Sequence, residues 1–455
     1  MAVGVVASPG RSLPRGLRKD IQGLRAVAVL LVVANHLVSS PSGGFVGVDI
    51  FFVISGFLIT DLMLRERDRT GRISYSGFYR RRIRRIIPLS VLVLASTVGV
   101  SYYIYRPIRA GIIRGDALWS SIFMSNWHFA AAGTDYFNNE NLTSPLQHFW
   151  SLAVEEQYYL VWPVAVIGLG MLAVGRISHR QVLAGVLLIA IAASFAFAMW
   201  ESSTESTRAY FSTLSRAWEL GVGALLAVLA PRLDKLPVRI QPVLSWVGLL
   251  GITLSVVMIG PDSTFPAPWA VLPVISTALV IGAGMSGGSR LLLPLTNPIT
   301  QYIGNISYSL YLWHFPVIIL MEAYFPDPHL ARLLAILAVM AIVTVLGFHF
   351  VEDPIRRSTW LEPRSSKMRK VRYRDNFDPD VMKRLGYSTL VASAVATLVL
   401  ATYLVFDTPL VQVASAGVQP VASPGAARPA TFQEKLKDQL VVAANASAFP
   451  ALDPA

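Results

Sequence analysis

Long apolar runs separated by short polar segments recur along most of the chain, and each is long enough for a helix to cross a bilayer. The segment 110–131 is more polar, with Arg114 and Asp116 near one end, and it predicts an interfacial or re-entrant helix. The pattern therefore indicates an all-α polytopic membrane protein. The eleven predicted spans are 22–39, 45–63, 86–104, 149–172, 183–200, 214–230, 243–259, 270–285, 303–321, 332–350 and 388–406.

Basic residues gather on one side of these predicted helices. With the N-terminus in the cytoplasm, the cytoplasmic segments hold 29 of the 39 Lys and Arg residues. Cytoplasmic loops of membrane proteins carry such an excess. We therefore expect a cytoplasmic N-terminus and an extracytoplasmic C-terminus in the inner (cytoplasmic) membrane. The net charge of +12 then reflects topology, and we expect no nucleic-acid partner.

The composition narrows the chemistry. Hydrophobic residues make up 54% of the chain, charged residues only 15%, and the mean hydropathy is +0.53. The chain has no cysteine, which excludes disulfides, thiolate metal sites and a cysteine nucleophile. No helical pair of histidines, or of glutamate and histidine, has the spacing of a metal site, so no metal is expected.

Two ionisable residues, Arg25 and His36, lie within the first predicted span. An arginine inside an apolar helix costs at least ~2.5–3.5 kcal/mol on insertion scales, so it is rarely without a role. Eleven residues of helix rotate by about 1100° and rise ~16 Å, which places both side chains on one stripe. The alternative is an arginine that reaches the lipid headgroups and a histidine bonded to a neighbouring helix.

The second span begins with Asp49 in the sequence GGFVGVDIFFVISGFLIT. The glycines before it permit a tight turn, so we expect Asp49 near His36, where a carboxylate would orient the imidazole ring. The alternative for Asp49 is a helix N-cap.

A cluster of arginines stands at the cytoplasmic start of the third span. Guanidinium groups suit phosphate, so the cluster predicts a clamp for a polyanionic ligand; a topology anchor on anionic lipid is the alternative. The arginines in question are Arg81, Arg82, Arg84 and Arg85, preceded by Arg80.

Further polar residues fall inside later spans. His148 and Glu155 are seven apart and share one helix face, with Glu156 turned roughly 80° away. At least one of these acids is expected to face a polar cavity. His148, with Tyr311 and His314 in the ninth span, is a weaker candidate for substrate contact. For the tyrosine the alternative is an ordinary aromatic residue near the membrane interface.

Taken together, these segments resemble the acyltransferase-3 family of membrane O-acyltransferases. The resemblance runs from about Lys19 to Arg357 and rests on the spacing of Arg25 and His36, an Arg-x-x-Arg pattern that occurs twice, and several sequence blocks. These blocks are GGFVGVDIFFVISGFLIT, HFWSLAVEEQYYLVWP, YSLYLWHFP and FVEDPIRR.

The resemblance implies a ten-helix core that transfers an acyl group, usually acetyl, from cytoplasmic acyl-CoA to a hydroxyl of an extracytoplasmic glycan or glycolipid. It implies that His36 is catalytic and that Arg25 and the loop arginines serve donor binding or structure; acyl-CoA would be a substrate, with no permanently bound cofactor. Some members carry an SGNH-type outer domain after an eleventh span, which the tail here is too short to hold. The expected parts are 1–20 (cytoplasmic), 21–357 (acyltransferase-like), 358–387 (basic loop), 388–406 (eleventh helix) and 407–455 (outer tail).

The residues permit two versions of this chemistry. His36 could act as general base with Asp49 orienting it, or could itself become acylated, and Glu155 could be a second acid or base or could position Arg25. The rival functional classes are a proton-coupled transporter and a non-catalytic scaffold. Neither accounts well for the arginine cluster together with the intramembrane histidine.

Overall fold

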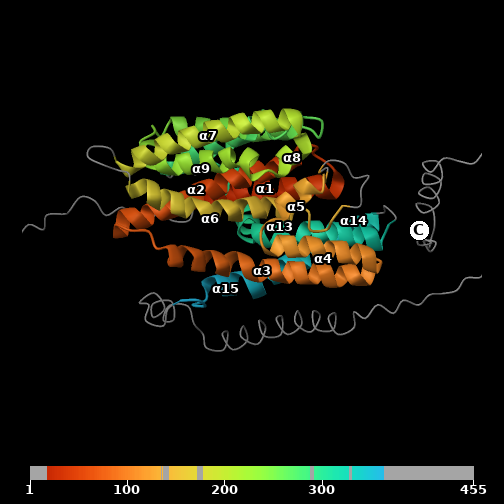
Figure 1. Ribbon diagram of the computed structural model, residues 1–455. Coiled ribbons are helices and arrows are strands. Elements are labelled where there is room, and N and C mark those ends of the chain that lie inside the picture. The colour runs from red at the N-terminus through yellow and green to blue at the C-terminus, as the bar shows by residue number, and fades with distance from the viewer. Residues whose placement is uncertain are drawn as a thin grey trace, which may run out of the picture. The chain divides into compact units, whose positions relative to one another are not determined.

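The computed structural model describes residues 18–134, 136, 143–171, 178–286, 292–326 and 330–362. All of them belong to one compact unit built from helices (Figure 1). The predicted eleventh span and the tail lie outside the described residues. The first half comprises α1 (Lys19–Val38), a 3₁₀ turn (Gly44–Val46), α2 (Gly47–Thr70), α3 (Tyr75–Ile104), α4 (Pro107–Ser121), α5 (Ser125–Ala131) and α6 (Phe149–Met171).

The second half continues the same architecture. Its helices are α7 (His179–Thr204), α8 (Ser206–Phe211), α9 (Thr213–Leu233), α10 (Ile240–Met258), α11 (Val271–Ala283), α12 (Leu293–Thr296), α13 (Pro298–Tyr324), α14 (Leu330–Leu346) and α15 (Asp353–Arg357). A 3₁₀ turn (Gly284–Ser286) follows α11, and a π-helical turn (Gly347–Glu352) joins α14 to α15.

Eight helices of the described chain are long and apolar enough to cross a membrane, so the prediction of an all-α polytopic membrane protein is confirmed. The predicted spans 149–172 and 270–285 correspond to α6 and to the 13-residue α11. The segment 110–131 falls on two short helices, α4 and α5, and α4 packs back along α3. This arrangement agrees with a re-entrant element rather than a further span.

Local sequence explains where the helices begin and end. The Ser74 hydroxyl accepts a hydrogen bond from the Gly77 amide and caps α3, and Asn297 caps α13 in the same way ahead of Pro298. The left-handed backbone that ends α2 is supplied by Gly71. Side-chain acceptors at N-caps and a left-handed glycine after the last turn are the usual helix boundary signals.

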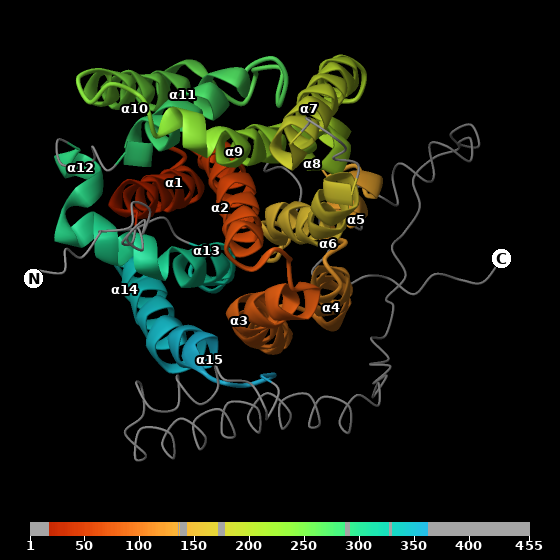
Figure 2. The same cartoon turned by 90° about the vertical axis from the view of Figure 1, so that its left-hand side faces the viewer.

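Glycines allow α2 and α9 to pack closely. A Cβ at Gly56 would lie 1.9 Å from the carbonyl oxygen of Leu220, and one at Gly223 would lie 2.0 Å from that of Val53. Figure 2 looks along the helices and shows α1, α2 and α13 enclosed by the others. These three central helices, together with α3 and α6, carry the polar residues of the candidate site.

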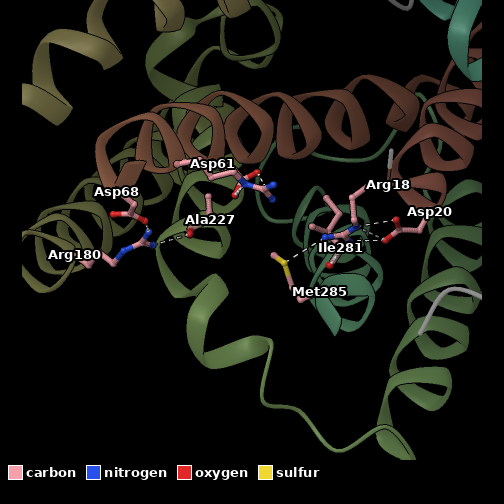
Figure 3. Close-up of polar contacts among 9 residues, drawn as sticks. Arg18, Asp20, Asp61, Asp68, Arg180, Ala227, Ile281 and Met285 are labelled. Atoms are coloured by element: carbon pink, nitrogen blue, oxygen red, sulfur yellow. Dashed lines mark hydrogen bonds and ion pairs between the residues drawn. The ribbon is translucent and has the colours of Figure 1, made fainter. Parts of the chain in front are cut away.

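The two ends of the bundle differ in chemistry. We call the end where α1 begins the basic end, and the end where α1 finishes the histidine end. At the basic end Arg18 binds Asp20 and the carbonyl oxygen of Ile281, while Arg180 binds Asp68 at 2.5 Å (Figure 3). Both cations are thus occupied by contacts that tie helix ends together.

Candidate functional site

A pocket of about 750 Å³, including the space at its mouth, lies between α1, α2, α3, α6 and α13. Its polar lining changes along its length, from arginines at the basic end, through a carboxylate, to hydroxyl groups toward the histidine end. Apolar side chains form most of the remaining wall. The residues that line it are Arg25, Val48, Phe51, Phe52, Ile54, Ser55, Leu58, Arg82, Arg85, Ile86, Ser151, Leu152, Glu155, Tyr159, Ser307, Tyr308 and Tyr311.

Three arginines reach this pocket from two helices: Arg25 from α1, and Arg82 and Arg85 from α3. The Arg25 guanidinium donates to Gln22 Oε1 at 3.2 Å, and that of Arg82 lies 4.1 Å from the centre of the Tyr159 ring. Within the described part of the chain, none of the three forms an ion pair. Guanidinium groups that line a cavity without a close ion-pair partner are suited to an anionic ligand.

The other two arginines of the predicted clamp, Arg81 and Arg84, do not line the pocket. Arg81 pairs with Glu66 at 3.2 Å, and Arg84, only 1% exposed, pairs with Glu362 at 2.8 Å. The helical period explains the division, because residues three apart share a face and each Arg-x-x-Arg pair takes a different one. The structure thus places only Arg82 and Arg85 of the four on the pocket wall, and ligand binding by Arg81 and Arg84 stays a prediction.

Among the described residues that line the pocket, Glu155 is the only one with a carboxylate. Its Oε1 accepts a hydrogen bond from Ser55 at 2.9 Å, and its Oε2 accepts one from Tyr159 at 3.1 Å. Two hydroxyl donors fix the carboxylate in the middle of the pocket. The expectation that one of the adjacent acids faces a cavity thus agrees with the structure, whereas Glu156 is not part of the lining.

Three histidines meet beyond the inner end of this pocket: His36 from α1, His314 from α13 and His148 from the turn before α6. The His36 and His314 rings stack with their centres 5.2 Å apart, and the His148 ring lies 5.4 Å from His314. The Tyr311 ring is 5.3 Å from His314 and 5.6 Å from His148, so it stands between the pocket and the histidines. The structure therefore brings together all three predicted histidines and Tyr311.

Hydrogen bonds within this cluster fix the tautomer of His36. The Tyr311 carbonyl can only accept, so His314 Nδ1, 2.6 Å away, carries a proton, and Nε2 of neutral His314 is an acceptor. His36 Nδ1, 3.0 Å from that Nε2, therefore donates. His36 Nε2 is left as an acceptor, 2.6 Å from the hydroxyl of Tyr136. Burial raises the pKa of the Tyr136 phenol, which keeps this hydroxyl protonated as the donor.

Asp49 does not orient His36, contrary to the prediction, since both ring nitrogens of His36 have other partners. The Asp49 carboxylate instead accepts from Arg216 at 2.9 Å, and Arg216 also binds Glu219 at 2.7 Å; all three are fully buried. Aromatic rings surround this guanidinium, including that of Trp150 at 5.4 Å. Asp49 therefore joins α2 to α9, and His314 takes the orienting place.

Sequence reasoning missed several polar residues at the site. Ser55, Ser151 and Tyr159 are ordinary residues in apolar helices, and no spacing rule singles them out. Tyr136 lies in the segment between α5 and α6, where it stacks on Tyr210 with ring centres 4.3 Å apart. Only the fold brings it to His36. Among the residues described, no group of three or more metal-ligating side chains is placed to hold an ion.

The fold and site define a multi-pass membrane protein with a basic intramembrane pocket that ends at a histidine cluster. The chain belongs to the acyltransferase-3 family (acyltransferase domain), whose pattern it matches over residues 18–351. The resemblance seen in the sequence is thereby confirmed. No solved structure matches the chain.

Three curated relatives illustrate the family. The peptidoglycan O-acetyltransferase OatA of Listeria monocytogenes is 33% identical over 358 residues, which cover 75% of this chain and 56% of that protein. YrhL of Bacillus subtilis, provisionally named a peptidoglycan O-acetyltransferase, is 35% identical over 74% of this chain and 54% of its own. SAR0937 of Staphylococcus aureus, provisionally an O-acetyltransferase, is 30% identical over 83% and 62%. The chain thus spans little more than half the length of these relatives.

Proposed function

We propose that this protein transfers an acetyl group from cytoplasmic acetyl-CoA to a hydroxyl of a cell-envelope glycan on the opposite face of the membrane. One observation carries the proposal: a single pocket has at one end three arginines that form no ion pair with any described residue, and a histidine cluster lies next to its other end. An anionic carrier with a reactive tip would bind such a pocket in one orientation only.

The arginines would hold the carrier's phosphates. Arg82 and Arg85 stand at the start of α3, and the charge asymmetry of the sequence assigns this end of the bundle to the cytoplasm. Along α2 the pocket extends from Leu58 to Val48, a rise of ~15 Å, which accommodates a narrow arm of the pantetheine kind. The thioester would then lie near Tyr311, next to the histidines.

His36 would act on the incoming hydroxyl through Nε2, the ring atom that accepts a hydrogen bond from Tyr136. As the acceptor oxygen attacks the thioester carbonyl carbon, its proton passes to Nε2. When the tetrahedral intermediate collapses, the C–S bond breaks and the CoA sulfur leaves with that proton. General base catalysis of this kind contributes typically ~10²–10⁴-fold. A transient acyl group on His36 Nε2 is the alternative route, and both routes need the same nitrogen.

The relatives support the choice of acceptor. Two of the three proteins above carry names that specify peptidoglycan O-acetylation. Peptidoglycan is therefore the first acceptor to test, and an SGNH-type domain or partner on the outer face would deliver the group to it. The transporter class remains the rival, and covalent product separates the two.

The test uses sealed vesicles that contain the protein, radiolabelled acetyl-CoA on the basic side and peptidoglycan fragments on the other. We expect label in the glycan with the parent chain and with His349→Ala, an exposed histidine bound to Tyr302, but not with His36→Ala. Transfer retained in folded His36→Ala would contradict the assignment. Free label that accumulates across the membrane without covalent product would favour a transporter.

A further inference from the structure

Tyr311 belongs both to the pocket and to the histidine cluster. Its side chain lines the inner end of the pocket. Its backbone carbonyl oxygen accepts the hydrogen bond from His314 Nδ1 that sets the tautomer of His314. The Phe51 ring packs edge-on against it with ring centres 6.0 Å apart. The ring position is thus fixed from the apolar side, and only the hydroxyl is free to change partners.

Two hydrogen bonds hold the Tyr311 hydroxyl. It lies 2.5 Å from Ser151 Oγ and 3.1 Å from the backbone carbonyl oxygen of His148. A carbonyl only accepts, and the Ser151 hydroxyl also lies 3.3 Å from the same His148 carbonyl oxygen. When Tyr311 donates to this carbonyl, Ser151 donates to Tyr311. Hydroxyl donors usually lie ~2.7–2.8 Å from an oxygen acceptor, so the bond to His148 is long and the Tyr311 proton is weakly held. A better acceptor in the pocket would draw it away.

We propose that the Tyr311 hydroxyl binds the carbonyl oxygen of the donor thioester and stabilises the oxyanion of its tetrahedral intermediate. This assignment rests on the proposed function. As the acceptor oxygen bonds to the carbonyl carbon, the carbonyl π-electron pair moves to oxygen, where Tyr311 donates its hydrogen bond without giving up the proton. The pair returns to re-form the carbonyl as the C–S bond breaks, and His36 supplies the proton for the leaving sulfur.

Ser151 is a positioning residue in this scheme. By donating to Tyr311, it occupies one lone pair of the phenol oxygen and polarises the O–H bond, since chains of hydrogen bonds strengthen one another. It also keeps the hydroxyl aimed away from the apolar wall. We therefore expect a smaller effect from its removal than from the loss of Tyr311's own hydroxyl.

The kinetic test compares Tyr311→Phe, which keeps the packed ring, with Ser151→Ala and the control Tyr302→Phe. Tyr302 lies on the same helix but does not line the pocket, and its hydroxyl bonds to His349. Loss of a single oxyanion donor lowers kcat by ~10²–10³-fold, so we expect this fall for Tyr311→Phe with the donor KM nearly unchanged. A raised KM with kcat retained would overturn the assignment.

A binding test distinguishes a donor to the carbonyl from a merely structural tyrosine. The probes are an acetyl-CoA analogue with CH₂ in place of sulfur, which keeps a ketone, and S-ethyl-CoA, which has no carbonyl. We expect the parent to prefer the ketone, and Tyr311→Phe to lose that preference while it binds S-ethyl-CoA as before. A variant that keeps the preference, or that weakens both ligands equally, overturns this assignment alone. A parent that binds neither probe overturns the proposed function itself.

Discussion

The four arginines of the α3 cluster should separate by function when each is replaced with alanine. Arg82 and Arg85 line the pocket without an ion-pair partner in the described chain, whereas Arg81 and Arg84 are bound to Glu66 and Glu362. The sequence offers no reason to distinguish them. The structure predicts three different outcomes for residues that are neighbours along one helix.

The magnitudes follow from burial and partners. A hydrogen bond to a charged group is worth about 1.5–3 kcal/mol, so Arg85→Ala should weaken CoA binding by ~10–150-fold. The Arg81–Glu66 pair is partly exposed, at 32% and 18%, and such pairs contribute ~0–1 kcal/mol, so Arg81→Ala should change CoA affinity by less than about fivefold. Arg84→Ala leaves the Glu362 carboxylate buried without its partner and should cost about 3–5 kcal/mol of stability.

The assay is calorimetric titration of CoA into protein in lipid nanodiscs, with the thermal midpoint of each variant measured in parallel. CoA that lacks its 3′-phosphate is titrated into the parent, Arg82→Ala and Arg85→Ala. In the variant that lacks the arginine bound to this phosphate, removing the phosphate should weaken binding less than it does in the parent, because the effects of removing two interacting groups are not additive. Equal loss of CoA affinity in Arg81→Ala and Arg85→Ala, at unchanged stability, would refute the division of the cluster into two faces.

Two further predictions concern packing and the orientation of the base. Gly56→Ala should lower stability by about 1–3 kcal/mol, because its Cβ would meet the Leu220 carbonyl. The control Gly185→Ala, where a Cβ would have nothing within 4 Å, should be neutral or slightly stabilising. The measurement is the thermal midpoint of each variant in detergent, and equal midpoints for the two variants would contradict the close α2–α9 contact. His314→Phe should lower kcat by up to the ~10²–10⁴-fold worth of a general base, because His36 loses the partner that fixes its tautomer; acetyl transfer at parental kcat would exclude this role.

The helices could be predicted from sequence because each depends on local composition. A long apolar run must form a helix in a bilayer, since its backbone groups have no other hydrogen-bond partners there. The more polar segment 110–131 forms two short helices, neither of which is among the helices long and apolar enough to be candidate spans. The rotation of each helix about its axis depends on its neighbours, and that is where prediction failed: the same Arg-x-x-Arg spacing places Arg82 in the pocket and Arg81 outside it.

The side-chain contacts at the site could not be predicted from the sequence for a related reason. Asp49 is near His36 along the chain, yet its partner is Arg216, 167 residues away, and the partner of His36 is His314, 278 residues away. A buried arginine needs a carboxylate partner, so Arg216 of α9 holds Asp49 of α2 in an ion pair. Neither distance along the chain nor residue type indicates that His314 would bond to His36 in the place expected for Asp49.

The order of groups along the pocket argues for transfer in one direction. Guanidinium groups stand at one end, the Glu155 carboxylate in the middle and hydroxyl groups at the other, with the imidazole groups beyond that end. If the anionic head of a ligand entered the pocket first, it would reach the Glu155 carboxylate and be repelled. If the head enters last, Arg82 and Arg85 can hold it at the basic end. In the proposed reaction the reactive tip of the ligand would therefore reach Tyr311, next to His36. A transport route would need no such fixed end.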